Sequence, residues 1–424
     1  MRPIFRCLLL LALLAPAARA GVGKIVLDQM ILPVTEDIIE EALADAAAAG
    51  DEALLIQLAT PGGLETSTRG IVNRILAAEL PVVVWVAPSG ARAASAGFFI
   101  LMAADVAAMA PGTNTGAAHP VVLGAEVDEV MREKLENDSA AFIRTIAARR
   151  GRNVEAAESA VRRSVAFTDQ EALQKGLIDL VAADEQALLA WIDGRPLRRF
   201  DGSVRTIDLA DHSVREIPIS LRHRVLAFIM DPNVAFVLLS LGMLALWAEF
   251  QNPGAILPGT VGALSILLAI IALNVLPTRY AAFALIVAAF AFFALEAKFQ
   301  SHGIFGIAGV IAMFLGGILL VEGPIPEMRV NWVTALAVSV SFGAIAVFLM
   351  SLAVRALRGK VTTGEEGMVG EVGVARTALD PEGKVFVHGE LWNAVSRSPV
   401  AAGEAVRVTA IRDLIIEVEP ARPA

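Results

Sequence analysis

The chain has 424 residues, of which 56% are hydrophobic and 19% are charged, and its mean hydropathy is +0.64. It is too apolar for an ordinary soluble protein, and its first half is too charged for a bundle lying wholly in a membrane, so two environments are implied. The formal net charge is −9, and no basic block is suited to a phosphate backbone, which argues against nucleic acid as a partner.

The N-terminus has the pattern of a secretory signal peptide over residues 1–20. Arg2 and Arg6 precede the apolar run "CLLLLALLAPA" and the small-residue site "ARA", which predicts cleavage after Ala20. The mature chain would then begin outside the cytoplasm. The only cysteine, Cys7, lies within this segment, so the mature protein is expected to have no disulfide and no thiolate metal site.

Residues 21–220 alternate strand-like runs with helical stretches. The runs "KIVLDQMI", "ALLIQLA" and "PVVVWVA" are typical of buried strands. The stretch "TEDIIEEALADAAAAG" predicts a helix with Thr35 as its N-cap residue and acidic residues in its first turn. Repeated units of this kind indicate an α/β domain with largely parallel strands, which is the candidate for catalysis.

Residues 225–355 contain five apolar runs of membrane-spanning character, at 234–250, 256–276, 281–297, 304–321 and 332–354, of which the first and third are short. An odd number of spans places the two ends of the chain on opposite sides of the membrane. Arg355, Arg358 and Lys360 follow the last span, so the C-terminal tail is predicted to be cytoplasmic. Arg222 and Arg224, ahead of the first span, oppose this orientation unless they belong to an interfacial helix.

The membrane region also contains a weak internal duplication. The segment "EFQNPGAILPGTVG" at 249–262 is echoed by "KFQSHGIFGIAGVI" at 298–311, an offset of 49 residues at four identical positions. Glu249 and Glu296 lie near the ends of the first and third spans. A proton or ion pathway is one interpretation of such groups, but a location at the membrane interface is favoured.

Residues 360–424 contain short strand-like runs separated by glycines, such as "KVFVHGELWNAVS" and "LIIEVEP". This pattern predicts a small five-stranded barrel of the OB type. Phe386 and Trp392 are its only aromatic residues, which favours a structural or protein-binding module over a nucleic-acid-binding one.

Ser95 is the candidate nucleophile of the α/β domain. It stands among small residues in "AASAG" and directly precedes the apolar run "FFILMAA", so it can open a buried helix whose N-terminus favours a developing oxyanion. The segment "TPGG" at 60–63 follows a strand and offers unhindered backbone N–H donors. The competing interpretation is that Ser95 only caps a helix.

Two residues are candidates for the base that such a serine requires. His119, in "GAAHPV", is the only histidine between residues 21 and 211. Lys134 lies on a predicted helix, at the edge of an apolar stripe formed by Met131, Leu135, Phe142 and Ile146, where partial burial would favour the neutral amine. The chain uses arginine as its default cation, and arginine cannot act as a base, which gives some weight to a retained lysine. A solvent-exposed lysine on the helix surface remains the alternative.

These motifs together resemble the Clp-protease-class membrane serine proteases of the long NfeD family. The resemblance is carried by "TPGG", by "SGARAASAGFFILMAADVAAMAPGTNTGAAHPV", by "GRN" at 151–153 and by "FTDQEALQKGLIDLVA" at 167–182. It continues through the membrane region into "GMVGEVGVARTALDPEGKVFVHGELWNAVS" and covers essentially the whole mature chain.

The resemblance implies a Clp/crotonase-like spiral βα domain over 21–220, a membrane domain over 225–355 and an OB-like domain over 360–424. It also implies a dyad in which Ser95 is the nucleophile and Lys134 the base. Gly62 or Gly63, together with Ala96, would supply the oxyanion N–H groups. A Ser/His triad is disfavoured because no aspartate stands before "FTDQEAL" to orient His119, although His119 can still line the cleft.

We therefore expect a membrane-bound serine endopeptidase, independent of ATP and using no cofactor or metal. The resemblance implies cleavage of hydrophobic segments and a stomatin-like or prohibitin-like membrane protein as partner, in membrane protein quality control. The predicted location is the inner membrane, with the protease domain extracytoplasmic and a homodimer as the smallest assembly. The alternatives are a catalytically silent scaffold for stomatin-like proteins and, less compatible with export, acyl-CoA chemistry.

Overall fold

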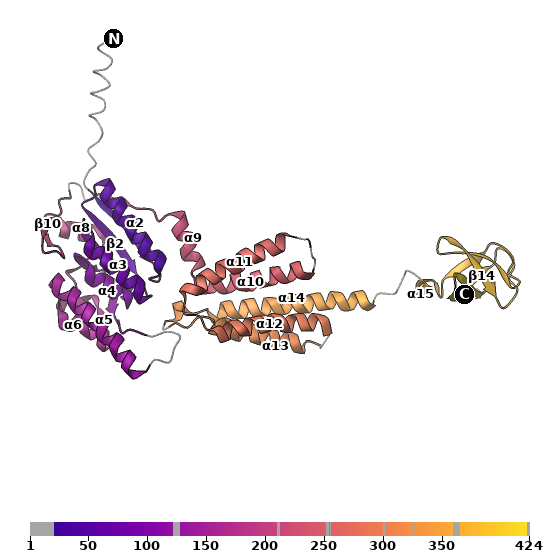
Figure 1. Ribbon diagram of the computed structural model, residues 1–424. Coiled ribbons are helices and arrows are strands. Elements are labelled where there is room, and N and C mark those ends of the chain that lie inside the picture. Colours follow the sequence, from indigo (N-terminus) through magenta and orange to yellow (C-terminus); the bar gives the residue numbers. More distant parts are fainter. Residues whose placement is uncertain are drawn as a thin grey trace, which may run out of the picture. The chain divides into compact units, whose positions relative to one another are not determined.

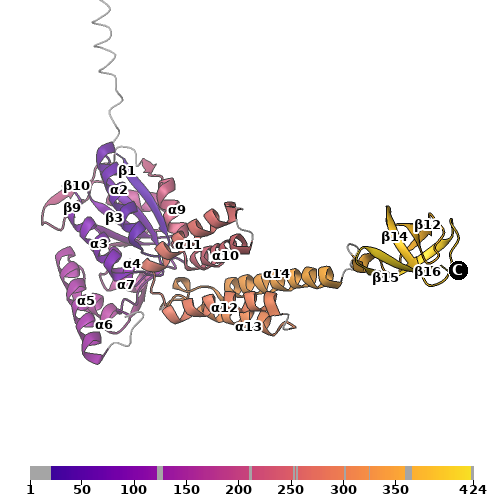
Figure 2. The same ribbon diagram turned by 45° about the vertical axis from the view of Figure 1, so that its right-hand side comes forward.

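A computed structural model describes residues 21–121, 128–209, 213–251, 254, 256–299, 302–323, 325–358 and 365–421 (Figures 1 and 2). The predicted signal peptide, residues 1–20, lies outside the described residues. The chain divides into two compact units, Met1–Ala344 and Ile345–Ala424. The first unit holds the α/β domain and most of the membrane helices, and the second holds the C-terminal barrel.

A parallel six-stranded sheet forms the centre of the α/β domain, with strand order β11-β1-β2-β3-β5-β8. Its strands are β1 (Val22–Asp28), β2 (Ala53–Ala59), β3 (Val82–Val86), β5 (Val106–Met109), β8 (Leu180–Val181) and β11 (Val214–Glu216). Side chains that alternate along β2 enter two different apolar clusters, Leu54 and Ile56 on one face and Leu55 on the other. Both faces of the sheet are therefore covered, as a parallel sheet requires.

Helices cover the two faces unequally. The larger cluster is covered by α2 (Pro33–Ala49), α3 (Glu65–Ala77), α4 (Ala96–Ala103), α5 (Glu129–Arg150), α6 (Val154–Arg162) and α7 (Asp169–Gln174). The smaller one is covered by α8 (Glu185–Ile192) and the hairpin of β9 (Pro196–Arg198) and β10 (Val204–Thr206). This arrangement confirms the expected Clp/crotonase-like spiral of βα units.

The start of α2 differs from the sequence prediction. The helix begins at Pro33 and its N-cap is Leu32, whereas Thr35 lies within the first turn. The Thr35 hydroxyl oxygen accepts a hydrogen bond from the Leu32 backbone N–H at 3.2 Å. Proline is well suited to the first helical position, because its missing N–H would have no partner there. Thr35 therefore caps the helix from inside its first turn instead of from the N-cap position.

Buried ion pairs hold the outer elements of the domain to its core. The Asp105 carboxylate has a fully buried side chain, lies 2.5 Å from Arg150 and 3.1 Å from Arg199, and accepts a hydrogen bond from the Val82 N–H. Burial lowers the pKa of Arg150 from its ordinary value, and the attraction of Asp105 opposes that shift. This cluster connects the end of α5 and the residue that follows β9 to the start of β3. Each buried charge in it has a partner of opposite charge, because an unpaired buried charge is energetically costly.

Five apolar helices follow, α10 (Pro232–Gln251), α11 (Leu257–Val275), α12 (Tyr280–Phe299), α13 (Ile304–Leu319) and α14 (Trp332–Arg358), and both views show them side by side. Four of the apolar segments are long enough to cross a membrane, and α13, with 16 residues, is shorter. The first and third helices, expected to be short, each have 20 residues. The end of α13 returns to the start of α12, where the Arg279 N–H donates to the Leu320 carbonyl, so these two helices form a hairpin.

The two helical hairpins α10–α11 and α12–α13 are built alike, because a glutamate in each caps the helix that follows it. The Glu249 carboxylate accepts hydrogen bonds from the N–H groups of Ile256 and Gly259. The Glu296 carboxylate accepts from the N–H groups at positions 303 and 306. In both hairpins two donors stand seven and ten residues after the glutamate, and Glu249 also accepts from the Gly254 N–H at 3.3 Å.

This repeated contact gives a second alignment of the duplication. Glu249 and Glu296 are 47 residues apart, and so are Gly259 and Gly306, whose N–H groups both donate to these carboxylates. The capping contacts thus add an alignment at an offset of 47 to the four identical positions at 49. The alignment at 49 matches residues of identical type. The alignment at 47 matches residues whose N–H groups make the same hydrogen bond in each hairpin.

A short helix, α9 (Leu221–Ile229), joins the α/β domain to the membrane helices. Its Leu226 and Ala227, with Met230 just beyond it, pack against the larger apolar cluster of the α/β domain. Leu221 and Phe228 are exposed, at 77% and 66%. The two arginines at 222 and 224 therefore lie on a short helix with one side packed on the α/β domain and another side exposed.

The second unit contains a closed five-stranded barrel with strand order β12-β13-β14-β16-β15, which confirms the OB-like prediction. Its elements are α15 (Glu365–Met368), β12 (Val372–Ala375), β13 (Glu382–Val387), β14 (Glu390–Ser396), β15 (Ala405–Arg412) and β16 (Ile415–Pro420). Alternate residues such as Val385, Val406 and Ile416 fill the interior. Each of these strands pairs with two neighbours, as closure of a sheet requires.

Candidate active site

Ser95 lies between a short strand and a buried helix. The strand β4 (Arg92–Ala94) belongs to a small three-stranded sheet with β6 (Asn114–Gly116) and β7 (Ala166–Thr168), and α4 begins directly after the serine. The backbone of Ser95 has φ of 51° and ψ of −108°, a conformation that L-residues rarely adopt. It is held there by its own N–H, which donates to the Gly116 carbonyl at 2.9 Å, and by its carbonyl, which accepts from the Phe98 N–H.

The strained turn distinguishes Ser95 from an ordinary capping residue. A capping serine accepts a hydrogen bond from the first turn of its helix, but no such bond is formed by the Ser95 side chain. Strain of this kind, held by the surrounding structure, is typical of functional positions. The turn therefore leaves the hydroxyl available for chemistry.

Gly62 lies against the nucleophile. Its φ is +125°, and a Cβ at this position would be 3.0 Å from the Cβ of Ser95. Its N–H donates to the Thr60 hydroxyl oxygen at 3.2 Å. Because this donor is already used within the turn, the structure favours Gly63 over Gly62 as the candidate oxyanion donor. Gly62 instead allows the two segments to approach closely.

Gly63 and Ala96 keep the properties expected of oxyanion donors. Within the described part of the chain, neither N–H has an acceptor, and both residues line the pocket that contains Ser95. A Cβ on Gly63 would overlap the Ile31 carbonyl oxygen, so only glycine fits there. The Ala96 N–H belongs to the first turn of α4, where the helix dipole also favours a negative charge.

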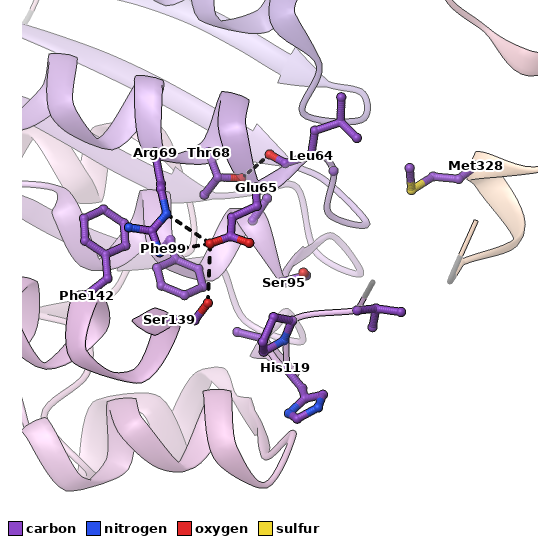
Figure 3. A pocket seen from close by; sticks show the side chains of 15 residues that line it. Leu64, Glu65, Thr68, Arg69, Ser95, Phe99, His119, Ser139, Phe142 and Met328 are labelled. Carbon is purple, nitrogen blue, oxygen red and sulfur yellow. Dashed lines mark hydrogen bonds and ion pairs between the residues drawn. The ribbon is translucent and has the colours of Figure 1, made fainter. Parts of the chain in front are cut away.

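A pocket of about 110 Å³ opens beside Ser95 (Figure 3). Most of its wall is apolar and comes from several elements. The apolar lining residues are Leu64, Ala96, Phe99, Ala118, Pro120, Val121, Phe142 and Met328. The rings of Phe99 and Phe142 stack with centroids 5.8 Å apart. Such a lining suits a hydrophobic side chain of a peptide.

One wall of the pocket is polar. Glu65 and Arg69, both on α3, form an ion pair of 2.9 Å, and Arg69 also pairs with Asp138 of α5. The Arg69 guanidinium lies 4.5 Å from the centroid of the Phe142 ring. These contacts join α3 to α5 across the pocket. Sequence reasoning missed this pair of helices as a wall, because its residues are charged and typical of a solvated face.

His119 lines the pocket but is directed away from the serine. Its Nδ1 lies 3.0 Å from the Val161 carbonyl oxygen, and Figure 3 shows the imidazole pointing away from the Ser95 hydroxyl. The expected place of His119 in the cleft is therefore observed, and its ring is oriented by a backbone carbonyl instead of a carboxylate.

Lys134 does not line the pocket in this structure. It is exposed on the second turn of α5, whereas the pocket is lined from α5 by Ser139 and Phe142. The expected partial burial of Lys134 is therefore not observed. The physical reason is that the N-terminal turns of α5 extend beyond the body of the domain, and Met131, on the same stripe, is 47% exposed. Lys134 still shares a side of α5 with Asp138, one turn later, which contacts Arg69.

In the described ranges no cluster of three or more His, Cys, Asp or Glu side chains could hold a metal ion. At the pocket these ranges present a hydroxyl, two N–H donors without an acceptor, and a cavity with an apolar lining and one polar wall.

Three family models match the chain in succession. They describe the NfeD1b N-terminal domain at residues 22–199, the NfeD integral membrane domain at 233–352 and the NfeD-like C-terminal, partner-binding domain at 365–420. The membrane-bound protease PH1510 of Pyrococcus horikoshii is 35% identical over 402 residues, covering 92% of this chain and 90% of that protein. The membrane protein NfeD1b of Bacillus subtilis is 25% identical and covers 86% of each chain.

Solved structures of the 1510-N membrane-bound stomatin-specific protease are also similar. A lysine-to-alanine mutant in complex with a substrate peptide is 30% identical, covers 50% of this chain and 98% of that one, and has a TM-score of 0.47. A serine-to-alanine mutant is 31% identical, with coverage of 48% and 99% and a TM-score of 0.45.

The fold, the presented serine and the membrane helices define a membrane-bound serine endopeptidase. The chain belongs to the long-form NfeD family, as the 35% identity along nearly its whole length establishes.

Proposed function

We propose that Ser95 is the nucleophile and Lys134 the general base of this endopeptidase. The neutral amine takes the Ser95 proton as the hydroxyl oxygen attacks a peptide carbonyl, an acyl-enzyme forms with release of the amine product, and water hydrolyses the ester. The N–H groups of Gly63 and Ala96 stabilise the oxyanion, a contribution of about 3 kcal/mol per donor in other enzymes. The observation that carries this proposal is the strained backbone of Ser95 beside two unused N–H donors.

The proposal requires Lys134 to approach Ser95. Lys134 lies five residues before Ser139 on α5, about 7.5 Å along the helix axis. Five residues also turn the helix by about 140°, so the first turns of α5 must both shift and rotate to bring the amine to the pocket. Catalytic hydrogen bonds often form only when substrate is bound. We therefore infer that substrate binding between α3 and α5 draws this part of α5 inward.

The apolar lining of the pocket supports cleavage within hydrophobic segments. Phe99 and Phe142 contribute much of the lining, and no acidic residue of the described lining other than Glu65 approaches it. Glu65 is itself paired with Arg69. A long apolar side chain would therefore be favoured at the cleavage site, and an acidic one would not.

The natural substrate or partner that we propose is a stomatin-like membrane protein. The support is the name of the similar 1510-N protease, called stomatin-specific, and the description of the matched C-terminal model as partner-binding. We place the protease domain on the extracytoplasmic side of the inner membrane, in homodimers or larger assemblies, and the barrel in the cytoplasm. The basic residues after α14 support this orientation, which requires the five predicted passes.

The test is cleavage of fluorogenic apolar peptides by the full-length protein in detergent or nanodiscs across a pH range. We expect Ser95→Ala and Lys134→Arg each to lose activity by about 10³-fold or more, because arginine keeps the charge but cannot accept a proton. Lys175→Arg, on an exposed lysine at the end of α7, is the matched control and should stay active.

Two results would change the proposal. An inactive His119→Ala with a fully active Lys134→Arg would move the role of base to His119. Failure of the wild-type protein to cleave any peptide, or to react with a fluorophosphonate at Ser95, would favour the catalytically silent scaffold.

A further inference from the structure

The pocket beside Ser95 has one wall that the protease domain does not supply. Met328 lines it, and this residue lies in the connection between the membrane helices α13 and α14 (Figure 3). The connection contains a short 3-10 helix, η1 (Pro326–Met328). A residue far along the sequence from the nucleophile, beyond four of the five membrane helices, thus belongs to the same pocket.

The connection holds Met328 in a defined place. Met328 is 1% exposed, and its N–H donates to the Ile325 carbonyl at 3.1 Å. The Arg329 guanidinium donates to the Gly323 carbonyl at 2.6 Å, which closes the loop around Met328. A Cβ on Gly323 would overlap the Cβ of Met328, so the glycine allows the backbone to pass close beside it. The position of Met328 is therefore defined by the packing and hydrogen bonds of this connection.

The same connection touches the strand that carries the nucleophile. Glu327 forms an ion pair with Arg92, three residues before Ser95 on β4. Both side chains are nearly half exposed, so this ion pair contributes little to stability. It favours one alignment of the α13–α14 connection against β4. The membrane helices contact the α/β domain mainly through apolar side chains. Leu226 of α9, Met230 at the C-cap of α9 and Val275 of α11 pack against the core of that domain.

We propose that Met328 is a substrate-contacting residue through which the membrane domain helps to select the hydrophobic side chain bound beside Ser95. This proposal rests on the proposed role of Ser95 and adds a specificity residue to that site. The polarisable and flexible thioether of methionine adapts to apolar side chains of different shape. An apolar side chain bound in the pocket would therefore contact Phe99 and Phe142 on one side and Met328 on the other.

The first experiment compares Met328 variants of the full-length protein on peptides that differ in one side chain, either a large apolar residue or alanine. We expect Met328→Ala to lower kcat/KM for the large apolar residue by about ten-fold, with less effect on alanine, because one hydrophobic contact discriminates by that order. Met328→Leu, which conserves volume, should remain close to wild type. Val333→Ala, on an exposed valine of α14 outside the pocket, is the control.

The second experiment does not depend on activity. In a Ser95→Ala background, Met328→p-benzoylphenylalanine should cross-link to a bound apolar peptide on illumination, and excess unlabelled peptide should compete. The same photoreactive residue at Val333 should not cross-link. Equal cross-linking at 328 and 333, or an unchanged preference of Met328→Ala in an active enzyme, would overturn the role of Met328. Loss of wild-type cleavage and of fluorophosphonate labelling would instead overturn the proposed function itself.

Discussion

Among single residues, the site depends on two backbone conformations that most residues avoid. Ser95 has φ of 51° and Gly62 has φ of +125°, and the two residues are in contact. The small residues around Ser95 indicated from sequence that the chain could pack closely there. Which of the two glycines keeps a free N–H was not predictable, because it depends on the Thr60 hydroxyl, which bonds Gly62 within the turn.

Gly62→Ala should therefore reduce kcat/KM strongly while the protein remains folded. The new Cβ would lie 3.0 Å from the Cβ of Ser95 and would displace the nucleophile. A misplacement of about 1 Å can cost about 100-fold in rate. Peptide cleavage by the purified full-length variant, with its thermal unfolding temperature, measures both effects.

The control is Gly50→Ala, at the C-cap of α2. Gly50 also has positive φ, +75°, but no described atom lies within 4 Å of the place that its Cβ would take. The variant should lose about 1 kcal/mol of stability from backbone strain and keep its activity. Equal loss of activity in both variants would show that strain, and not contact with Ser95, is responsible.

At the scale of helices and strands, hydrophobic periodicity predicted the positions of the helices in the chain better than it predicted their contacts. The stripe on α5 is real, but only its C-terminal part is buried, since Ile146 is 1% exposed and Met131 is 47% exposed. A hydrophobic period shows which side of a helix is apolar and not how far a neighbouring element extends. For this reason Lys134 was expected at a partly buried edge, whereas the structure leaves it exposed.

The repeated helical hairpin is a second case in which the sequence alone did not predict the contacts of particular side chains. Glu249 and Glu296 were open to interpretation as an ion pathway, but each caps the N-terminus of the following helix through backbone N–H groups. A carboxylate at this end of a helix satisfies unpaired donors and complements the helix dipole. The fold therefore gives both glutamates a structural role as helix caps.

Glu296→Ala should destabilise the membrane domain by about 2 kcal/mol, because two charge-assisted hydrogen bonds are lost at a buried helix end. Glu249→Ala should cost less, since Glu249 is partly exposed and its bonds are longer, at 3.1 to 3.3 Å against 2.8 to 3.1 Å. Thermal unfolding of the full-length protein in detergent compares the two variants. A larger effect of Glu249→Ala would contradict this ranking.

For the whole molecule, the number of passes decides the orientation of the chain. Four segments are long enough to cross a membrane and α13 is shorter, yet α13 returns beside the start of α12. The packing of the hairpin therefore supports five passes where length alone supports four. Five passes place the protease domain and the C-terminal tail on opposite sides.

Reporter fusions test this topology. Alkaline phosphatase fused after residue 220 should be active, because it folds outside the cytoplasm, and a fluorescent protein fused to the C-terminus should fluoresce, because it folds inside. Both reporters on one side would show that α13 does not cross the membrane.

Local pattern was sufficient to predict the three kinds of domain, the positions of the apolar helices and the barrel, and it indicated Ser95 as the candidate nucleophile. These features follow from hydrophobic period and from the small residues around one serine, all of which are continuous in the chain. Three features of the site required the folded chain, namely that Gly63 and not Gly62 is free, that Lys134 is exposed, and that Met328 lines the pocket. Each of these depends on how particular groups meet in the packed fold, which close packing specifies and local pattern does not record.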